Sequence, residues 1–206
     1  MISVSTILSW LAWLARLISA GWRKIRRPRV KELRAPVNLF EHIQPYVSIE
    51  HLRDVFGVPY RTEQGWITFK FSDVFVQIVS KDGTTVSSAD VLLRRISPFT
   101  IFPVYLLEYV LGKSTLASIL DSDSEIKKEY SSKFFCVYVN RYFGFPGKYN
   151  HYTFGVYSGP GIRAPKYKWN NKINKLESDP NRVLVNWVRI TSSKEEAVTP
   201  NFYHFL

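Results

Sequence analysis

The first 34 residues constrain this chain more than any other stretch, because a long apolar run is followed at once by a basic one. Residues 2–22 contain one charged side chain, Arg16, and residues 23–34 contain seven Lys or Arg and one Glu. A helix rises about 1.5 Å per residue, so the apolar run would reach about 31 Å, close to the roughly 30 Å hydrocarbon core of a bilayer. The sequence therefore predicts three regions: a transmembrane anchor over residues 1–22, a basic juxtamembrane linker over residues 23–36 and a domain over residues 37–206.

The basic residues after the apolar run indicate the orientation of the anchor. Lys and Arg accumulate on the cytoplasmic side of membrane spans, so we expect a single-pass protein of the bacterial inner membrane with its C-terminal domain in the cytoplasm. The same cations can contact anionic lipid headgroups, and the expected contacts are Lys24, Arg26, Arg27 and Arg29. Two other arrangements stay open: a helix that lies flat in the membrane interface, and a secretory signal peptide, although the charge follows the apolar run instead of preceding it.

Small and polar residues recur along the anchor at alternating steps of four and three. This spacing places them on one face of a helix. Small residues let two helices approach closely within a membrane, so we expect a homo-oligomer that is joined through this face. The residues of this expected seam are Ser5, Ser9, Ala12, Arg16, Ser19 and Arg23.

The distribution of charge argues against a domain that binds long nucleic acids. The chain has a net charge of +11, but Arg16 and residues 23–34 account for +7, which leaves +4 for residues 35–206. A mildly basic domain gives no evidence for nucleic-acid binding. Cys136 is the only cysteine, so an intramolecular disulfide is excluded, in agreement with a reducing compartment.

The patterns of the domain predict an α+β fold that is rich in strands and has short helices. Residues 48–57 have the signature of a helix, with Ser48 as N-cap and Gly57 after the last turn. Further helices are expected from about Val104 and within residues 111–120. Apolar alternation or short apolar runs predict strands over residues 66–71, 74–79, 84–88, 134–142, 151–157 and 183–191. The order of a helix and then a meander occurs twice, which indicates two halves, residues 37–95 and 96–206.

No motif for catalysis, metal binding or cofactor binding is complete. Gly112-Lys-Ser-Thr115 matches the end of a P-loop, but position 107, where the first glycine belongs, is Leu. Residues 121–125 begin like a calcium loop but lack the glycine and the glutamate that should follow. The four histidines lack the spacing of metal ligands. We therefore expect no cofactor and no metal, and a protein that is not an enzyme; an enzyme that uses His151 is the least favoured alternative.

Two segments interleave aromatic and basic residues, which can stack on a base and pair with a phosphate. They predict a site for a small nucleotide or a protein partner, and the alternative is a solvated rim with half-buried tyrosines. The residues of the expected site are Arg141, Tyr142, Lys148, Tyr149, Asn150, His151, Tyr152, Arg163, Lys166, Tyr167, Lys168 and Trp169.

Three short motifs, together with the anchor, carry a resemblance to a known family. They are Gly57-Val-Pro59, Leu111-Gly-Lys-Ser-Thr115 and Tyr142-Phe-Gly-Phe-Pro-Gly-Lys-Tyr149. The chain resembles a family of uncharacterised bacterial single-pass membrane proteins with a cytosolic α+β domain. Residues 48–79 are also similar to the helix-then-meander half of small outer-membrane-assembly lipoproteins and β-lactamase inhibitor proteins, which implies an interaction module, although the lipoprotein cysteine is missing.

These observations together predict a membrane-anchored sensor or effector. Its cytosolic domain would bind a small ligand or a protein partner, and its anchors would associate. The hypothesised setting is bacterial stress or antiviral defence. The alternative is a passive interaction or assembly module that is tethered to the membrane.

Overall fold

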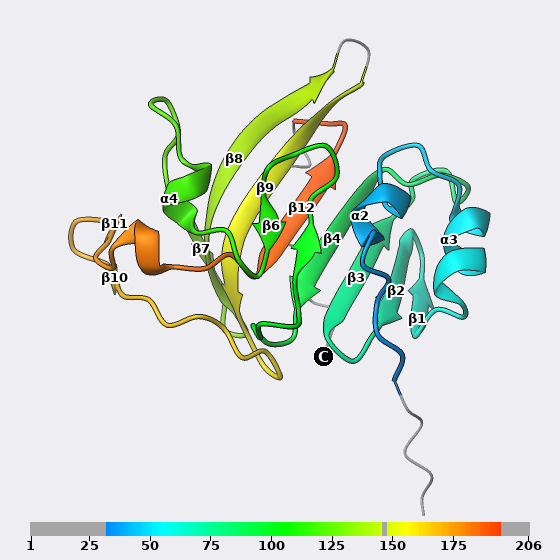
Figure 1. Ribbon diagram of the computed structural model, residues 1–206, viewed down its shortest axis with the longest axis horizontal. Helices are drawn as coiled ribbons and strands as arrows, with labels where there is room; N and C mark the ends of the chain where they lie inside the picture. Colours follow the sequence, from blue (N-terminus) through cyan, green and yellow to red (C-terminus); the bar gives the residue numbers. More distant parts are fainter. Residues whose placement is uncertain (1–31, 146–147, 195–206) are drawn as a thin grey trace, which may run out of the picture. The chain divides into compact units, whose positions relative to one another are not determined.

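An antiparallel eight-stranded sheet forms the centre of the protein (Figure 1). The computed structural model describes residues 32–145 and 148–194. The strands lie in the order β1-β2-β3-β4-β12-β9-β8-β7. Their bounds are β1 Arg61–Glu63, β2 Trp66–Lys70, β3 Val74–Val79, β4 Ser88–Leu93, β7 Lys127–Tyr130, β8 Phe135–Phe145, β9 Lys148–Ser158 and β12 Trp187–Thr191.

Short helices and two small ribbons complete the described part of the chain. The helices are α2 Leu39–His42, α3 Ile49–Phe56, α4 Leu116–Ile119 and the 3-10 helix η1 Pro180–Arg182. The ribbons pair β5 Phe102–Pro103 with β6 Val110–Leu111, and β10 Trp169–Asn170 with β11 Lys175–Leu176. The expected α+β class, mostly sheet with few short helices, is therefore confirmed.

The strand order is symmetric about the central pair of β4 and β12. In the first half α3 precedes β1, β2, β3 and β4, and in the second half α4 precedes β7, β8, β9 and β12. The strands β4 and β12 pair antiparallel from Trp187 opposite Leu92 to Thr191 opposite Ser88. Each half thus contributes its last strand to the middle of one continuous sheet.

The helix α3 has the termini that its sequence predicts. The hydroxyl oxygen of Ser48 accepts a hydrogen bond from the backbone N–H of His51 at 3.1 Å, which satisfies one of the free donors of the first turn. Gly57 ends the helix with φ of 78°, a conformation that costs glycine little. The buried residues Ile49, Leu52 and Phe56 form the face that packs into the core.

The helix expected from Val104 is wrong. Residues 104–109 form turns between β5 and β6, and the backbone N–H of Val104 donates to the carbonyl of Tyr109 at 2.8 Å. The apolar side chains of this segment suggested a buried helix, but Leu106 adopts a positive φ of 60° and cannot continue one.

Three further boundaries differ from the sequence pattern. The strand expected over residues 84–88 begins only at Ser88, the first residue of β4. Before it, the Asp82 carboxylate accepts hydrogen bonds from the backbone N–H groups of Thr84 and Thr85, each at 2.8 Å, and Thr85 forms only an isolated bridge with Ser48. The expected helix over residues 111–120 is reduced to α4, whose cap is Thr115. The strand β7 lies in a polar stretch for which no strand was expected.

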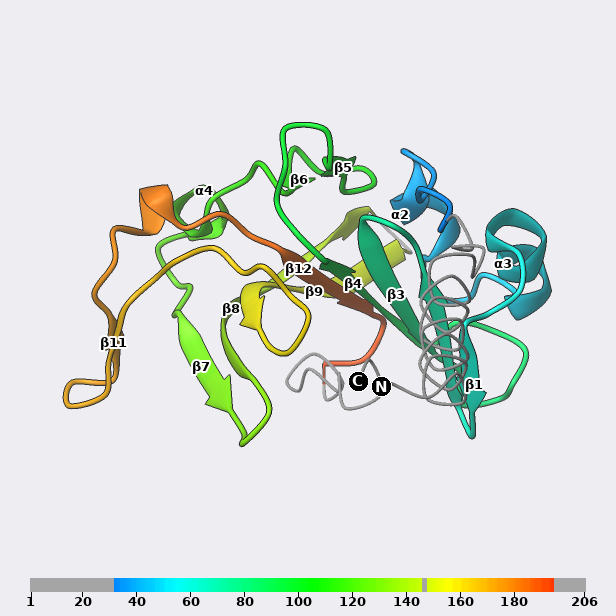
Figure 2. The ribbon, with the colours of Figure 1, turned by 90° about the horizontal axis from the view of Figure 1, so that it is seen from below.

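All helices of the described residues lie over one face of the sheet, which we call the helix face (Figure 2). One residue from each of six adjacent strands forms an apolar row across this face. The row consists of Phe69, Val76, Val91, Val188, Phe154 and Val139. These six side chains are buried in the main core with those of α2, α3 and α4.

The opposite face, the far face, carries a polar row in the same register. The row consists of Thr68, Gln77, Asp90, Arg189, Thr153 and Asn140. Asp90 and Arg189 form a buried two-point ion pair, with Nε–Oδ1 at 2.9 Å and Nη2–Oδ2 at 2.7 Å, and the Trp187 indole N–H donates to Asp90 Oδ1 at 3.0 Å. A smaller apolar cluster that includes Phe75, Leu92 and Trp187 lies beside the row.

No helix in the described part of the chain is long and apolar enough to cross a membrane. The expected anchor over residues 1–22, its seam and its headgroup contacts lie outside the described residues. The described residues from Leu33 onward form one compact unit.

Candidate functional site

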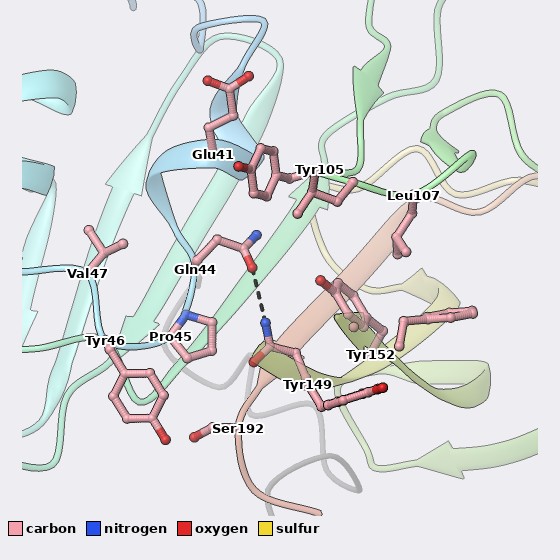
Figure 3. Close-up of a pocket in the computed structure, with 14 residues that line it drawn as sticks. Glu41, Gln44, Pro45, Tyr46, Val47, Tyr105, Leu107, Tyr149, Tyr152 and Ser192 are labelled. Carbon is pink, nitrogen blue, oxygen red and sulfur yellow. Dashed lines mark hydrogen bonds between the residues drawn. The ribbon is translucent and has the colours of Figure 1, made fainter. Parts of the chain in front are cut away.

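A cavity of about 660 Å³ lies where segments from distant parts of the sequence meet (Figure 3). One wall is α2 with the chain that follows it, and a second wall is the loop between β5 and β6. The end of the β8–β9 hairpin forms a third wall, and Ser192, just after β12, completes the lining. We call this cavity the tyrosine pocket; its lining residues are Glu41, Gln44, Pro45, Tyr46, Val47, Tyr105, Leu106, Leu107, Phe143, Gly144, Tyr149, Asn150, Tyr152 and Ser192.

A pair of side-chain amides joins two walls of the tyrosine pocket. Gln44 donates from Nε2 to the carbonyl of Phe40 at 2.7 Å, which fixes its side chain against α2. Its Oε1 then accepts a hydrogen bond from Nδ2 of Asn150 at 3.2 Å, the contact drawn in Figure 3. The first half of the domain is thereby connected to the tip of the β8–β9 hairpin in the second half.

The backbone is strained at two residues that line the pocket. Tyr46 and Leu106 adopt positive φ values of 72° and 60°, which β-carbon sterics disfavour for residues other than glycine. Tyr46 is held by a hydrogen bond from its N–H to the carbonyl of Val86 at 2.8 Å, and its side chain is 75% exposed. Strained residues persist where the surrounding structure holds them, and they concentrate at functional sites.

Three tyrosines give the pocket its chemical character. Tyr46, Tyr105 and Tyr149 are all exposed, and in Figure 3 their rings lie on three sides of Gln44. Aromatic faces carry partial negative charge and attract cations as well as apolar groups. A fourth ring, Tyr152, is buried at the base, and this burial raises the pKa of its hydroxyl, so the group stays a neutral hydrogen-bonding partner.

The charges of the described lining do not favour a phosphate. Of the fourteen described residues that line it, only Glu41 carries a formal charge, and that charge is negative. A phosphate is normally held by Arg, Lys or a helix N-terminus. The arrangement instead favours a neutral or cationic ligand with an apolar part.

The first predicted binding segment is only partly assembled into this pocket. Tyr149, Asn150 and Tyr152 line it, but the rings of Tyr142 and His151 lie tilted against each other on the far face, with centroids 4.5 Å apart. The ring of Tyr149 also stacks on Tyr142, with centroids 5.3 Å apart. The side chain of Lys148 lies outside the described residues.

Arg141 has a structural role instead of facing the pocket. Its guanidinium pairs with the Asp121 carboxylate at 3.0 Å and donates to the carbonyl of Ile119. It also lies over the ring of Phe143, 4.7 Å from the centroid. These contacts fix the end of α4 against the sheet.

The second predicted segment lies at the opposite end of the hairpin. Arg163, Lys166, Tyr167, Lys168 and Trp169 line a separate groove of about 940 Å³ beside Phe135 and Ser158. In the register of β8 and β9, Phe135 is opposite Ser158 whereas Gly144 is opposite Tyr149. At about 3.3 Å per residue the two ends are roughly 30 Å apart. The expectation of one site built from both segments is therefore wrong.

Sequence reasoning missed most of the pocket. Glu41, Gln44, Tyr46 and Tyr105 were not predicted, because their spacing matches no binding motif. The one sequence feature that could have indicated the pocket is the pair Pro45-Tyr46, which stands in a segment with few other turn residues. Such a pair is too common to identify a site by itself.

The chemistry of the described residues offers no assembled nucleophile or metal centre. Burial raises the pKa of the Cys136 thiol to about 12, so this sulfur is inert. Among the described residues no group of three or more His, Cys, Asp or Glu could hold a metal ion. His42 and His51 do approach each other, with ring nitrogens 3.0 Å apart, and connect α2 to α3.

No protein-family model, curated protein or solved structure matches this chain.

Proposed function

We propose that this chain is a membrane-tethered binding protein that senses a ligand in the tyrosine pocket. The observation that carries the proposal is the pocket itself: two strained residues, Tyr46 and Leu106, and three exposed tyrosines surround a cavity between the two halves. The tether is the predicted helix of residues 1–22, and the setting of stress or antiviral defence remains part of the proposal. A ligand that contacts both α2 and the hairpin would stabilise their relative position.

The lining supports a ligand with a cationic group. Tyrosine rings on several sides together with one carboxylate, Glu41, are the components of an aromatic cage for ammonium or guanidinium groups. A free organic cation and a Lys or Arg side chain of a partner protein share this chemistry.

Thermal unfolding of the full chain in detergent tests the proposal. We expect a polyamine, a quaternary amine or an arginine-rich peptide to raise the melting temperature, because a ligand that binds only the folded state stabilises it. Tyr105→Ala should weaken this binding about tenfold, since a desolvated cation–π contact contributes up to roughly 2 kcal/mol. Tyr60→Ala is the control, because Tyr60 is also an exposed tyrosine, pairs with Lys70 of β2 and does not line the pocket.

Two results would contradict this assignment. Nucleoside phosphates that bind in competition with the amines would show that the pocket is not selective for cations. Equal binding by the Tyr105→Ala and Tyr60→Ala variants would place the site elsewhere.

A second candidate is a passive interaction module, which an exposed apolar loop favours. Phe99, Ile101 and Leu106 expose their side chains along the segment that leads to and forms the β5–β6 loop, and Phe99 is 84% exposed. Sedimentation in detergent separates the two functions: a sensor changes its oligomeric state when the pocket ligand is added, whereas a passive module does not.

A further inference from the structure

Residues 158–178 carry the net positive charge of the domain. They contain five Lys or Arg and one Glu, a net charge of +4, which equals the net charge of all residues 35–206. These residues form the loop after β9, the β10–β11 ribbon and the chain after it. The rest of residues 35–206 is neutral overall, so the net positive charge of the domain is concentrated in this segment.

The groove at this end presents hydrogen-bond donors as well as cations. Arg163, Lys166 and Lys168 are exposed along it, and Lys128 of β7 adds a fourth cation, 5.5 Å from the centre of the Trp169 ring. The hydroxyl of Tyr167 and the indole N–H of Trp169 are buried, and neither has a hydrogen-bond partner within residues 32–145 and 148–194. Lys128 also donates to Oδ1 of Asn171 at 3.0 Å. The three exposed cations, together with the two buried groups that lack a partner, match a ligand that is rich in acceptor oxygens.

Backbone contacts hold the groove in place. The N–H of Arg163 donates to the carbonyl of Arg94 at 2.9 Å, and the N–H of Glu177 donates to the carbonyl of Lys168 at 2.9 Å. The hydroxyl of Ser178 accepts from the N–H of Lys168 at 2.7 Å. The cations are therefore presented on a fixed backbone.

The β10–β11 ribbon ends in an exposed apolar residue between lysines. The Asn170 side chain accepts hydrogen bonds from the N–H groups of Lys172 at 2.9 Å and Ile173 at 3.3 Å, which shapes the turn. Ile173 is 62% exposed at the tip, and Lys172 and Lys175 flank it. The ribbon lies beyond β7, on the side of the eight-stranded sheet away from α3 (Figure 1). An apolar tip between cations is suited to the boundary between lipid headgroups and acyl chains.

We propose that the β10–β11 tip and the basic groove form a contact site for anionic phospholipid headgroups. The phosphate oxygens lie against Arg163, Lys166 and Lys168, and Ile173 enters the interfacial layer. This site is distinct from the tyrosine pocket, and it does not depend on the function proposed for that pocket.

A fluorophore at the tip of the ribbon tests the contact. The full chain with Ile173→Cys is labelled with a polarity-sensitive dye, and Val58→Cys is the matched control because Val58 is 93% exposed in the other half. The native Cys136 is buried with its pKa raised to about 12, so it resists labelling. With vesicles of phosphatidylcholine and phosphatidylglycerol, we expect a blue shift and stronger emission at position 173 and no change at position 58.

Vesicles of phosphatidylcholine alone, which contain no anionic lipid, are the control that distinguishes headgroup recognition from attachment through the N-terminal segment. Attachment alone brings the protein to these vesicles and leaves the label at position 173 unchanged. The double variant Lys166→Gln/Lys168→Gln should need roughly 25-fold more anionic lipid, since each surface cation contributes about a fivefold change. Lys81→Gln/Lys113→Gln, at exposed positions outside the groove, should behave as the unsubstituted chain.

Three outcomes would overturn the proposal. One is an equal response at position 173 to both kinds of vesicle. Another is an equal loss of response in the two double-lysine variants. The last is a response to glycerol phosphate or to single-stranded RNA in solution without a response to anionic vesicles.

Discussion

The two rows that cross the central sheet lie one residue apart on every strand, yet they bury opposite kinds of side chain. On the helix face the row runs through Val91 and Phe154, and every member is apolar. On the far face the row runs through Asp90 and Arg189, and every member is polar. The comparison shows that pleating alone separates two environments within one sheet, because successive side chains point to opposite faces.

The rows should respond differently to substitution. Apolar side chains contribute through contact area and packing, so a truncation leaves a cavity that no neighbour fills. Paired charges contribute only as long as both partners and their hydrogen bonds are present.

Removal of one member of the buried ion pair should have the largest effect. Asp90→Ala takes the carboxylate away from both Arg189 and the Trp187 indole, and we expect it to lower the free energy of unfolding by about 3–5 kcal/mol. The double variant Asp90→Leu/Arg189→Met should recover most of this loss. Urea unfolding of the chain in detergent measures both values.

The control for the ion-pair variants is a truncation in the apolar row of the helix face. Phe154→Ala should also cost about 3–5 kcal/mol, but no second truncation in the same row should recover stability. If the double substitution at positions 90 and 189 were as unstable as Asp90→Ala, the ion pair would be essential in itself and the contrast between the faces would be lost.

Two buried amides provide the second test, because one is fully bonded and the other is not. Asn186 accepts from the N–H of Tyr157 at 2.7 Å and donates to the carbonyl of the same residue at 2.9 Å. Gln77 is 0% exposed, and within the described ranges its amide has no hydrogen-bond partner. We expect Asn186→Leu to cost about 2–3 kcal/mol, and Gln77→Met to be neutral or to stabilise by about 1 kcal/mol.

Melting temperatures of the two variants check this order. A clear loss of stability in Gln77→Met would mean that its amide is bonded to a group outside the described residues. That result would make the middle of the far face a contact surface instead of a self-contained row.

The smallest expected effect is a pH dependence at the hairpin end of the far face. Burial, and then the positive charge of Lys194, lower the pKa of His151 below its ordinary value. Between the folded pKa and about 6.5, the unfolded pKa, the unfolded state binds more protons than the folded state. Stability should therefore fall as the pH is lowered through this window.

Unfolding curves between acid and neutral pH measure this slope. His151→Gln should flatten it, whereas His51→Gln, at an exposed position on α3, should leave the contribution of His151 in place. A slope that is unchanged in His151→Gln would assign the pH dependence to another group.

Local sequence signals predicted the elements whose boundaries are set locally. Ser48 and Gly57 mark the ends of α3 because a cap and a positive φ each need particular residue types. The strands β2 and β3 were also predicted, because the apolar pattern that marks a strand lies within the strand itself. The glycines and the proline of residues 144–150 are typical of a loop, and the strands expected over residues 134–142 and 151–157 stop short of them. The ladder of β8 and β9 nevertheless extends to Phe145 opposite Lys148.

Features that depend on the alignment of distant segments were not predictable from the sequence. The polar row takes Thr68, Gln77 and Asp90 from the first half and its other members from the second, and only the register of the strands brings them together. The tyrosine pocket has the same origin, since residues 41–47, 105–107 and 143–152 line it. Neither set has a sequence spacing that could distinguish it from ordinary half-buried residues.

The position of β12 has a consequence for folding during synthesis on the ribosome. This strand is the last of the sheet along the chain, yet it lies between β4 and β9. Until residues 187–191 have been translated, both halves present an unpaired edge that can recruit the wrong strand. The sheet can close only when β12 inserts between β4 and β9. Until then, the nascent chain must avoid pairing the edge of one half with the edge of the other.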